Sequence, residues 1–332
     1  MNILYLSCHS ILEHDEVKLF TELGHKVFSL GSYQNPLAPQ DQKRPPIEGF
    51  YNDHLQSVAI QCSKENLHQE LIDWADVVMV MHRHDWIILN WTKMKHKKVV
   101  WRTIGQSIPD LEALLALPRS EGMKIVRYSP EERNIPGYLG EDAVIRFYKN
   151  QNEYSCWNGS IPAVMTVAQS MKKRDKFCNF NAFEQTTRGL PRILFGPDNE
   201  DTGIAGGLLS YEDLKAAYRN HRVYFYTGTY PASYTLNFIE AMMTGIPVIA
   251  IGPKLADIGL YPMQTYEVHK IIKHKENGFC SDDLDELKGN LDYMLQHLEK
   301  AREIGEAGRK TACELFGWDV IAKQWKKFFE SL

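Results

Sequence analysis

The chain has 332 residues, with 38 Lys and Arg against 42 Asp and Glu, so its formal net charge is −4. A composition of 44% hydrophobic and 24% charged residues is that of a folded globular protein and excludes a wholly disordered chain. No apolar run reaches the roughly 18–20 residues that span a bilayer, and Glu13 interrupts any secretory apolar segment. We therefore expect a soluble, cytoplasmic protein with no membrane span. The length predicts two domains.

Six cysteines lie far apart, without a C-x-x-C pair or a zinc-type spacing. A disulfide framework is not expected in a chain of this length, and reduced thiols fit a reducing compartment. The mild negative charge argues against an obligate nucleic-acid coat, because non-specific affinity for phosphate backbones comes from clustered Lys and Arg.

Short apolar runs alternate with amphipathic helical stretches in the first half of the chain, a pattern that favours α/β architecture. The expected elements there are strands at residues 3–6, 26–30, 76–81 and 98–102, helices at residues 11–23 and 64–74, and a polar loop through residues 35–46.

After a polar, turn-rich stretch at residues 150–162 the same pattern restarts. The elements expected next are strands at residues 163–167, 192–195, 222–226 and 247–251, helices at residues 179–187, 211–219 and 234–243, and a helical tail from about residue 284. Two doubly wound domains joined near residue 155 are the natural interpretation.

The most informative stretch is residues 227–252, where a strand ends, a helix follows and Pro247 leads into another strand. Within that helix Glu240 is the only charge on an otherwise apolar segment. A buried carboxylate needs a partner. Two interpretations stay open at this point: an ion pair or hydrogen bond inside the protein, or a hydroxyl of a bound ligand.

The start of the same helix is a candidate anion site. The N–H groups around Ser233, Tyr234 and Thr235 have no partners within a helix that begins there, and helix N-termini favour negative charge.

This stretch resembles the C-terminal signature of retaining GT-B glycosyltransferases of family four. The residues that match it are Tyr230-Pro231, Glu240-Ala241, Gly245 and Pro247-Val248. Further matches in family order are Gly24-His25-x-Val27, Asp76-Val77-Val78 leading to His82, Glu276-Asn277-Gly278-Phe279, and Arg309 before Phe316-Gly317-Trp318. The resemblance therefore extends over nearly the whole chain.

The resemblance implies a GT-B fold, with two doubly wound Rossmann-like α/β domains facing across a cleft. It implies an acceptor-side domain at residues 1–155, a nucleotide-sugar-binding domain at residues 156–315, and a C-terminal helix at residues 316–332 that crosses back to the first domain. The implied activity is a hexosyl or pentosyl transfer from a nucleotide-sugar, with a UDP-sugar as first choice, to an unknown acceptor. Retention of configuration is implied as well.

The resemblance also implies individual roles in the second domain. Glu240 takes the position of the carboxylate that holds the ribose hydroxyls of the donor. The family's other carboxylate, which contacts the donor sugar, falls on Ala232, so the identity of the sugar and activity itself are open.

A basic cluster, residues 172–174, directly follows the strand at residues 163–167. The family places two cations near this point to hold the diphosphate, and Lys173 and Arg174 are the candidates. Fixed cations that stabilise a leaving diphosphate make a metal dispensable in principle, so no cofactor is required in this interpretation. The alternative is a solvated basic turn.

In the first domain, His82 and His84 follow a strand, and the family often has a His there that contacts donor or acceptor, which makes them the candidate catalytic residues. A surface role and, less favoured, a metal site are the alternatives. The candidate acceptor-side residues are His9, Ser10, Arg102 and Gln106.

Residues 93–98 form a basic run that predicts a solvated face, with contact to an anionic acceptor such as DNA as the functional alternative. Phage-type glucosyltransferases of GT-B fold modify hydroxymethylated DNA bases, which requires extrusion of the base. An epimerase acting on the nucleotide-sugar and a non-catalytic nucleotide-sugar binder are the two other classes left open.

Overall fold

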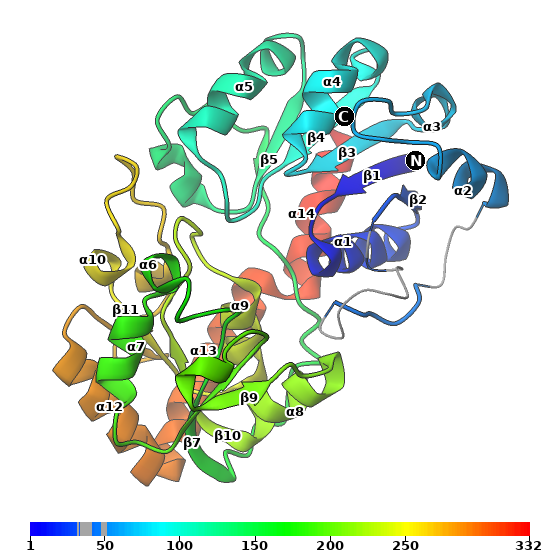
Figure 1. Ribbon diagram of the computed structural model, residues 1–332. Helices are drawn as coiled ribbons and strands as arrows, with labels where there is room; N and C mark the ends of the chain where they lie inside the picture. The colour runs from blue at the N-terminus through cyan, green and yellow to red at the C-terminus, as the bar shows by residue number, and fades with distance from the viewer. Residues whose placement is uncertain (32, 34–41, 48–51) are drawn as a thin grey trace. The chain divides into compact units, whose positions relative to one another are not determined.

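The structure, a computed structural model, describes residues 1–31, 33, 42–47 and 52–332. The chain divides into two compact units, and Figure 1 labels most of their elements. Unit 1 comprises Met1–Tyr148 and Ile321–Leu332, and unit 2 comprises Lys149–Val320. Of the polar loop expected at residues 35–46, residues 35–41 lie outside the described residues. No helix in the described part of the chain is both long and apolar enough to cross a membrane.

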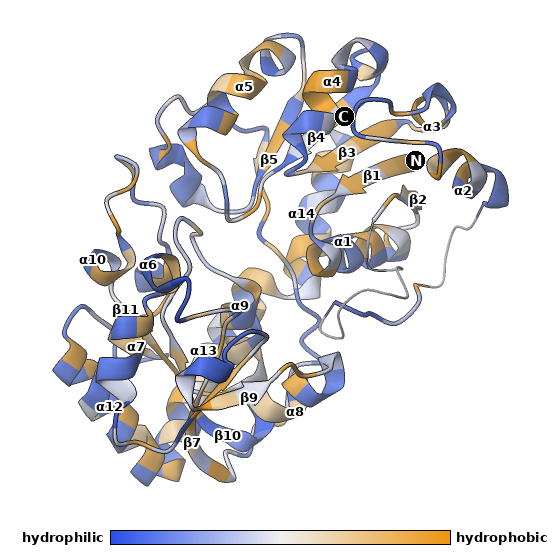
Figure 2. Ribbon diagram, in the orientation of Figure 1, coloured by the Kyte–Doolittle hydropathy of each residue, from blue (hydrophilic) through white to orange (hydrophobic). Residues whose placement is uncertain are grey.

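Unit 1 contains, within the described residues, a six-stranded parallel sheet in the order β2-β1-β3-β4-β5-β6. Its strands are β1 (Asn2–Ser7), β2 (Lys26–Ser29), β3 (Val77–Met81), β4 (Lys98–Arg102), β5 (Lys124–Arg127) and β6 (Ala143–Val144). Its helices include α1 (Ser10–Glu22), α2 (Asp53–Ala59), α3 (Gln69–Trp74), α4 (His84–Met94) and α5 (Pro109–Ser120). All five residues of β3 are buried, as expected for a central parallel strand, and β1 and β3 are largely orange in Figure 2.

Unit 2 has a second parallel sheet, also six-stranded in the described residues, in the order β12-β11-β10-β7-β8-β9. Its strands are β7 (Ile161–Val167), β8 (Arg192–Phe195), β9 (Ala205–Gly207), β10 (His221–Tyr226), β11 (Val248–Ile251) and β12 (Phe279–Ser281). Its helices include α6 (Asp175–Cys178), α7 (Phe180–Thr187), α8 (Tyr211–Asn220), α9 (Leu236–Thr244), α10 (Pro253–Ala256), α11 (Val268–Ile271), α12 (Leu284–Gln296) and α13 (Leu298–Phe316).

Each sheet has one point at which the strand order reverses direction. In unit 1 the chain runs from β1 outwards to β2 and then returns to β3 on the other side of β1. In unit 2 it runs from β7 outwards to β8 and β9 and returns to β10 on the other side of β7. The helices that follow two such neighbouring strands lie on opposite faces, which leaves room for a ligand at the carboxyl ends of the strands.

The last helix, α14 (Trp318–Glu330), supplies an aromatic part of the core of unit 1. Trp325 is fully buried, and its ring meets that of Phe20 of α1 at 4.8 Å between centroids. The Arg102 guanidinium lies 5.3 Å from the same indole ring and donates to the Glu16 carboxylate at 2.8 Å. The end of the chain and the sheet of unit 1 therefore share one core.

Every expected element is present, with differences at the ends, and the structure adds elements that were not expected, among them α2, α4, α5, β5, β9 and β12. The strand expected at residues 98–102 is β4 with the same bounds. The helix expected from residue 64 begins only at Gln69, because Ser63 and Asn66 pair with each other in a turn. The helix expected from residue 234 begins at Leu236, with Thr235 as its N-cap.

Candidate functional site

Four loops lie at the carboxyl ends of the strands where the two sheets reverse their order. In unit 2 these are residues 168–174 after β7 and residues 227–235 after β10. In unit 1 they are residues 8–10 after β1 and residues 82–84 after β3. Apart from Glu240, Arg102 and Gln106, every site residue expected from the sequence lies in one of these four loops. The topology thus brings together residues that are far apart in the sequence within each unit.

The loop after β7 presents three adjacent exposed cations, Lys172, Lys173 and Arg174. The Lys172 ammonium donates to the carbonyl of Asp201 at 3.0 Å, and the Arg174 guanidinium donates to the carbonyl of Gln169 at 3.4 Å. Among the described residues Lys173 has no hydrogen-bond or ion-pair partner. Two of the three cations, Lys173 and Arg174, thus have most of their donors available to a ligand.

Asn199, which sequence reasoning missed, fixes the path of this loop. Its fully buried amide donates to the carbonyls of Ala168 and Gly196 at 2.7 and 3.0 Å and accepts the N–H of Met171 at 2.8 Å. Ser170, between them, has a φ of 47°, which most side chains avoid. The cationic loop is therefore held in one shape by a side chain from the loop after β8.

The start of α9 lies on the other side of the reversal point in unit 2. Its N-cap Thr235 makes no capping bond to the helix but contacts the Tyr226 hydroxyl at 3.2 Å. The Asn237 amide donates to the carbonyl of Val167, the last residue of β7, at 2.6 Å. The first N–H groups of a helix have no partners within it, so this end of α9 suits an anion.

Two residues of the expected anion site contribute backbone rather than side chains. Ser233 is fully buried and Tyr234 is 1% exposed. The Tyr234 ring packs against Phe316, with 5.3 Å between the ring centroids. Only the main chain of these two residues can reach a ligand at the helix start.

Glu240 lies one turn further along α9 and is paired inside unit 2. Its carboxylate accepts the Lys149 ammonium at 2.8 Å, and the hydroxyls of Tyr154 and Tyr218 donate to it at 3.2 and 3.4 Å. Glu240 is 5% exposed and Lys149 is 3% exposed. Burial and the charge of Glu240 raise the pKa of Tyr218 well above its usual range, which keeps the hydroxyl protonated.

This buried ion pair favours the first of the two interpretations that the sequence left open. The ribose contact of Glu240 stays a prediction. Lys149, Tyr154 and Tyr218 could not be identified as partners from the sequence, because they precede Glu240 by 91, 86 and 22 residues (240 − 149, 240 − 154, 240 − 218) and no local pattern connects them.

His82 and His84 lie where β3 ends and α4 begins. Burial, and then the neighbouring His84, lower the pKa of His82 to about 4, so its imidazole is neutral at neutral pH. Its φ of 57° is unusual for a residue other than glycine, and such strain is often found at functional sites. The Gln106 side chain hydrogen-bonds to His82, and the Nδ1 atoms of His82 and His84 have no partner in the described residues.

The remaining acceptor-side candidates have different surroundings. His9 is the N-cap of α1, where its Nδ1 accepts the Leu12 N–H at 3.4 Å. Ser10 is 5% exposed, and its hydroxyl donates to the side-chain amide oxygen (Oε1) of Gln42 at 3.3 Å. Arg102 is fully buried, so it has no surface to offer an acceptor, and its contacts with Glu16 make it part of the core.

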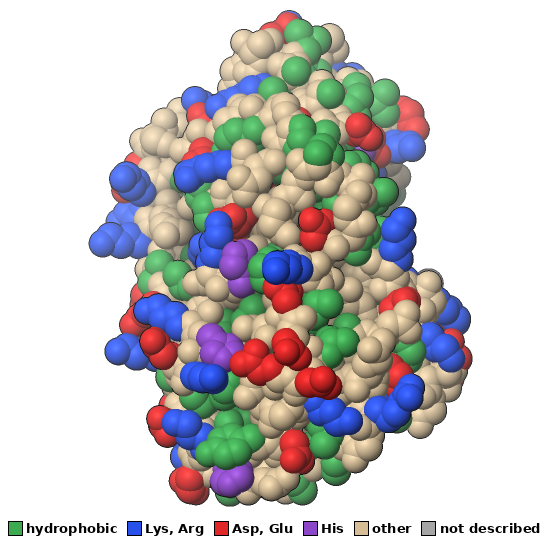
Figure 3. Space-filling model, turned by 90° about the vertical axis from the view of Figure 1, so that its left-hand side faces the viewer, with side chains coloured by type: hydrophobic (Ala, Val, Ile, Leu, Met, Phe, Trp, Pro, Cys, Tyr) green, Lys and Arg blue, Asp and Glu red, His purple; other side chains and the backbone are tan. Residues whose placement is uncertain are grey.

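The basic run at residues 93–98 is largely engaged with unit 1 itself. Lys93 and Lys97 donate to backbone carbonyls of preceding segments, and Lys95 pairs with Glu121 at 3.2 Å. On the face seen in Figure 3, blue and red side chains are interspersed and form no continuous basic field. These contacts favour the interpretation of the run as an ordinary solvated face.

Among the residues that the structure describes, no group of three or more His, Cys, Asp or Glu side chains is placed to bind a metal ion.

Comparisons with known proteins agree with this architecture. Residues 180–327 match a family model described as glycosyl transferase-like. No protein of curated function matches the chain. Among solved structures, Anabaena HepE in complex with UDP-glucose is similar over 100% of both chains, with a TM-score of 0.68 and 15% identity.

Two further solved structures are similar over almost their whole length. Sucrose-phosphate synthase from Thermosynechococcus elongatus covers 100% of this chain and 98% of its own, with a TM-score of 0.67 and 14% identity. A glycosyltransferase from Rickettsia africae covers 99% of this chain and 98% of its own, with a TM-score of 0.66 and 14% identity. The protein thus has the α/β fold of GT-B glycosyltransferases, as the sequence predicted.

The ion pair of Glu240 leads to a prediction about stability. Glu240→Gln leaves the Lys149 charge buried without a counter-ion, and breaking a buried pair in this way costs about 3–5 kcal/mol. Urea unfolding should show this loss in Glu240→Gln and a comparable loss in Lys149→Met, with partial recovery in the double variant.

Lys149→Met is also the control for ligand binding. A ribose contact by Glu240 predicts weaker binding of uridine diphosphate in Glu240→Gln than in Lys149→Met, whereas a purely structural role predicts equal changes. A Glu240→Gln variant as stable as the unmodified protein would contradict the ion pair.

The lowered pKa of His82 predicts a pH dependence of stability. The fall from 6.5 to about 4 favours the neutral imidazole in the folded state by about 3 kcal/mol. This contribution is complete above pH 6.5 and is lost as the pH falls through about 4. Asn tolerates a positive φ, so His82→Asn removes the titrating group without adding backbone strain.

Urea titrations at pH 7, 5.5 and 4 measure this contribution as the difference between the two proteins. The unmodified protein should lose stability relative to His82→Asn as the pH falls, while exposed His96→Gln should follow the unmodified protein. A difference that does not change with pH would show that His82 titrates normally.

Proposed function

We propose that this protein is a glycosyltransferase that moves a sugar from a nucleotide-sugar, with a UDP-sugar as first choice, to an acceptor bound by unit 1. The observation that carries the proposal is the cationic loop of residues 172–174 across the reversal point from the open start of α9. HepE, which has the same fold, was solved with UDP-glucose.

In this proposal Lys173, Arg174 and the N–H groups at the start of α9 hold the diphosphate. The bond between the sugar and the diphosphate breaks during transfer, so negative charge grows on the leaving phosphate. Fixed cations and helix N–H groups stabilise that charge more strongly in the transition state than in the ground state, which is how they accelerate the reaction. Retention of configuration is carried over from the family resemblance.

Unit 1 supplies the acceptor side. His82, whose imidazole is neutral at neutral pH, is the proposed hydrogen-bond partner of an acceptor hydroxyl. His84, His9, Ser10 and Gln106 remain proposed neighbours of the acceptor. Cytoplasmic location and the lack of a required cofactor belong to the same proposal.

Incubation with a panel of nucleotide-sugars, followed by mass spectrometry, separates the three classes. Release of a nucleoside diphosphate supports a transferase. An isomerised donor would instead indicate an epimerase, and an intact donor that nevertheless binds would indicate a non-catalytic binder. Hydroxymethylated DNA among the tested acceptors examines the DNA alternative.

We predict that Lys173→Ala/Arg174→Ala weakens uridine diphosphate binding about tenfold, because charge-assisted hydrogen bonds to phosphate are lost. Binding of uridine, which carries no phosphate, should change little. Calorimetry measures both affinities.

Lys172→Ala is the matched control, since its ammonium is directed to the Asp201 carbonyl and not to the proposed diphosphate. Equal losses for uridine and uridine diphosphate in the double variant would exclude the assignment.

A further inference from the structure

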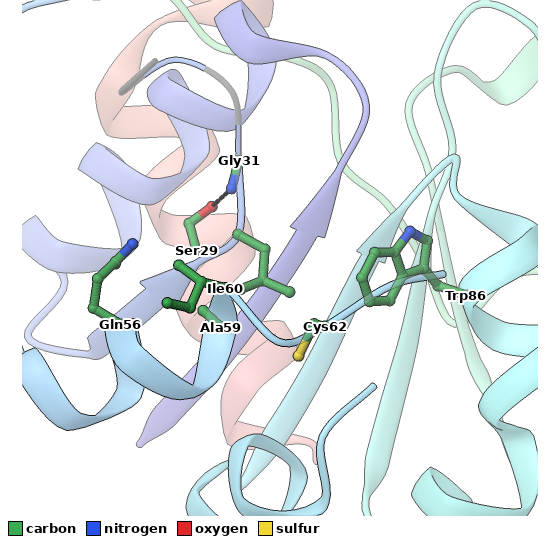
Figure 4. Close-up of a pocket in the computed structure, with 8 residues that line it drawn as sticks. Ser29, Gly31, Gln56, Ala59, Ile60, Cys62 and Trp86 are labelled. Atoms are coloured by element: carbon green, nitrogen blue, oxygen red, sulfur yellow. Dashed lines mark hydrogen bonds between the residues drawn. The ribbon is translucent and has the colours of Figure 1, made fainter. Parts of the chain in front are cut away.

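A cavity of about 420 Å³ lies in unit 1 beside the carboxyl end of β2. As Figure 4 shows, its walls come from the residues after β2, from α2 with the turn that follows it, and from Trp86 of α4. Its volume is in the range of small-ligand sites, which is roughly 300–1,000 Å³.

The walls combine apolar surface with neutral polar groups. None of the described residues that line the cavity carries a charge. Trp86 is 9% exposed, and its indole N–H has no partner in the described part of the chain. The Gln56 side-chain amide is likewise without a partner there, and Ile60, 79% exposed, adds an apolar rim. These walls suit a ligand that offers an oxygen to the indole N–H and an apolar face to the apolar wall.

The floor of the cavity disfavours an anion. The Ser29 hydroxyl donates to the buried Glu13 carboxylate and accepts the Gly31 N–H at 3.1 Å. A Cβ atom at Gly31 would overlap that carboxylate, so only glycine permits this close approach. A ligand carboxylate or phosphate placed here would lie near Glu13, and the described lining residues include no cation. The Arg83 guanidinium over the Trp86 ring is paired with Asp85 at 3.2 Å.

We infer that this cavity binds an uncharged ring bearing several hydroxyls, a neutral sugar unit, and that this ring is part of the acceptor. A sugar ring matches the walls because it has both hydroxyl oxygens and an apolar face of C–H groups. The assignment of this ring to the acceptor rests on the proposed function. The binding of a neutral sugar in this cavity is independent of the proposed function.

Cys62, which lines the cavity, provides a local probe, and exposed Cys156 of unit 2 is an internal control. The intact protein is alkylated with iodoacetamide, without any donor, in the presence of methyl glucoside, galactoside, mannoside or N-acetylglucosaminide. Peptide mass spectrometry follows each thiol. At a concentration of twice its Kd, a bound glycoside should slow the reaction of Cys62 about threefold by mass action and leave Cys156 unchanged.

A matched pair of variants locates the effect. Gln56→Ala should lose the protection, whereas Gln61→Ala, an exposed glutamine on the same segment that does not line the cavity, should keep it. Equal protection by methyl glucuronide would overturn the uncharged class, and protection by none of the glycosides would overturn the site. Because no donor is present, these outcomes are independent of whether the protein consumes a nucleotide-sugar.

Discussion

The reversal of strand order in each parallel sheet is the constraint on which the rest of the structure depends. In unit 2 the chain leaves β7 towards β8 on one side and returns from β9 to β10 on the other side of β7. Parallel connections of this kind are right-handed as a rule, so the two connections place their helices on opposite faces of the sheet. The carboxyl ends of β7 and β10 therefore remain uncovered between them. In unit 1 the strand order reverses between β1 and β3, so the carboxyl ends of these two strands are likewise uncovered. Sites can form at these two points because the topology, and not any one side chain, keeps them open.

In unit 2, polar side chains hold the segments on either side of the reversal point in place. Asn199 bonds to three backbone groups of the loops after β7 and β8, and Asn237 ties the first turn of α9 to the end of β7. These bonds hold the cationic loop and the helix start at defined positions. Preorganised charge and N–H groups of this kind need not reorganise when an anion binds, which is the main source of electrostatic catalysis.

Glu240 and Arg102 show how buried charge is accommodated in the two units. Each is fully or almost fully buried and each has an oppositely charged partner, Lys149 and Glu16. A buried charge whose partner is removed costs several kcal/mol, so these pairs specify which segments pack together. In unit 2 the pair joins α9 to the segment that begins the unit. In unit 1 Arg102 joins β4 to α1 and the ring of Trp325.

Many of the strands and helices can be predicted from local sequence patterns. The contacts between side chains that are far apart in the sequence cannot be predicted in this way. Continuous apolar runs such as residues 77–81 indicate buried parallel strands, and Gly245 followed by Pro247 marks a helix end before a strand. Lys173, Arg174 and the start of α9 remain predictions from the sequence. The sequence could not identify Asn199, or pair Glu240 with Lys149, because these contacts depend on strand order. It also named Arg102 as an acceptor-side candidate, although this side chain is buried and donates to the Glu16 carboxylate in the core.

Hydrogen–deuterium exchange with and without uridine diphosphate tests the central claim, that the reversal point of unit 2 binds the diphosphate. The N–H groups at the start of α9 and in the cationic loop are the ones that a bound diphosphate would engage. The account predicts slower exchange at residues 168–174 and 235–238, with little change in the loops of unit 1. Slower exchange confined to other segments, or none at saturating ligand, would contradict it.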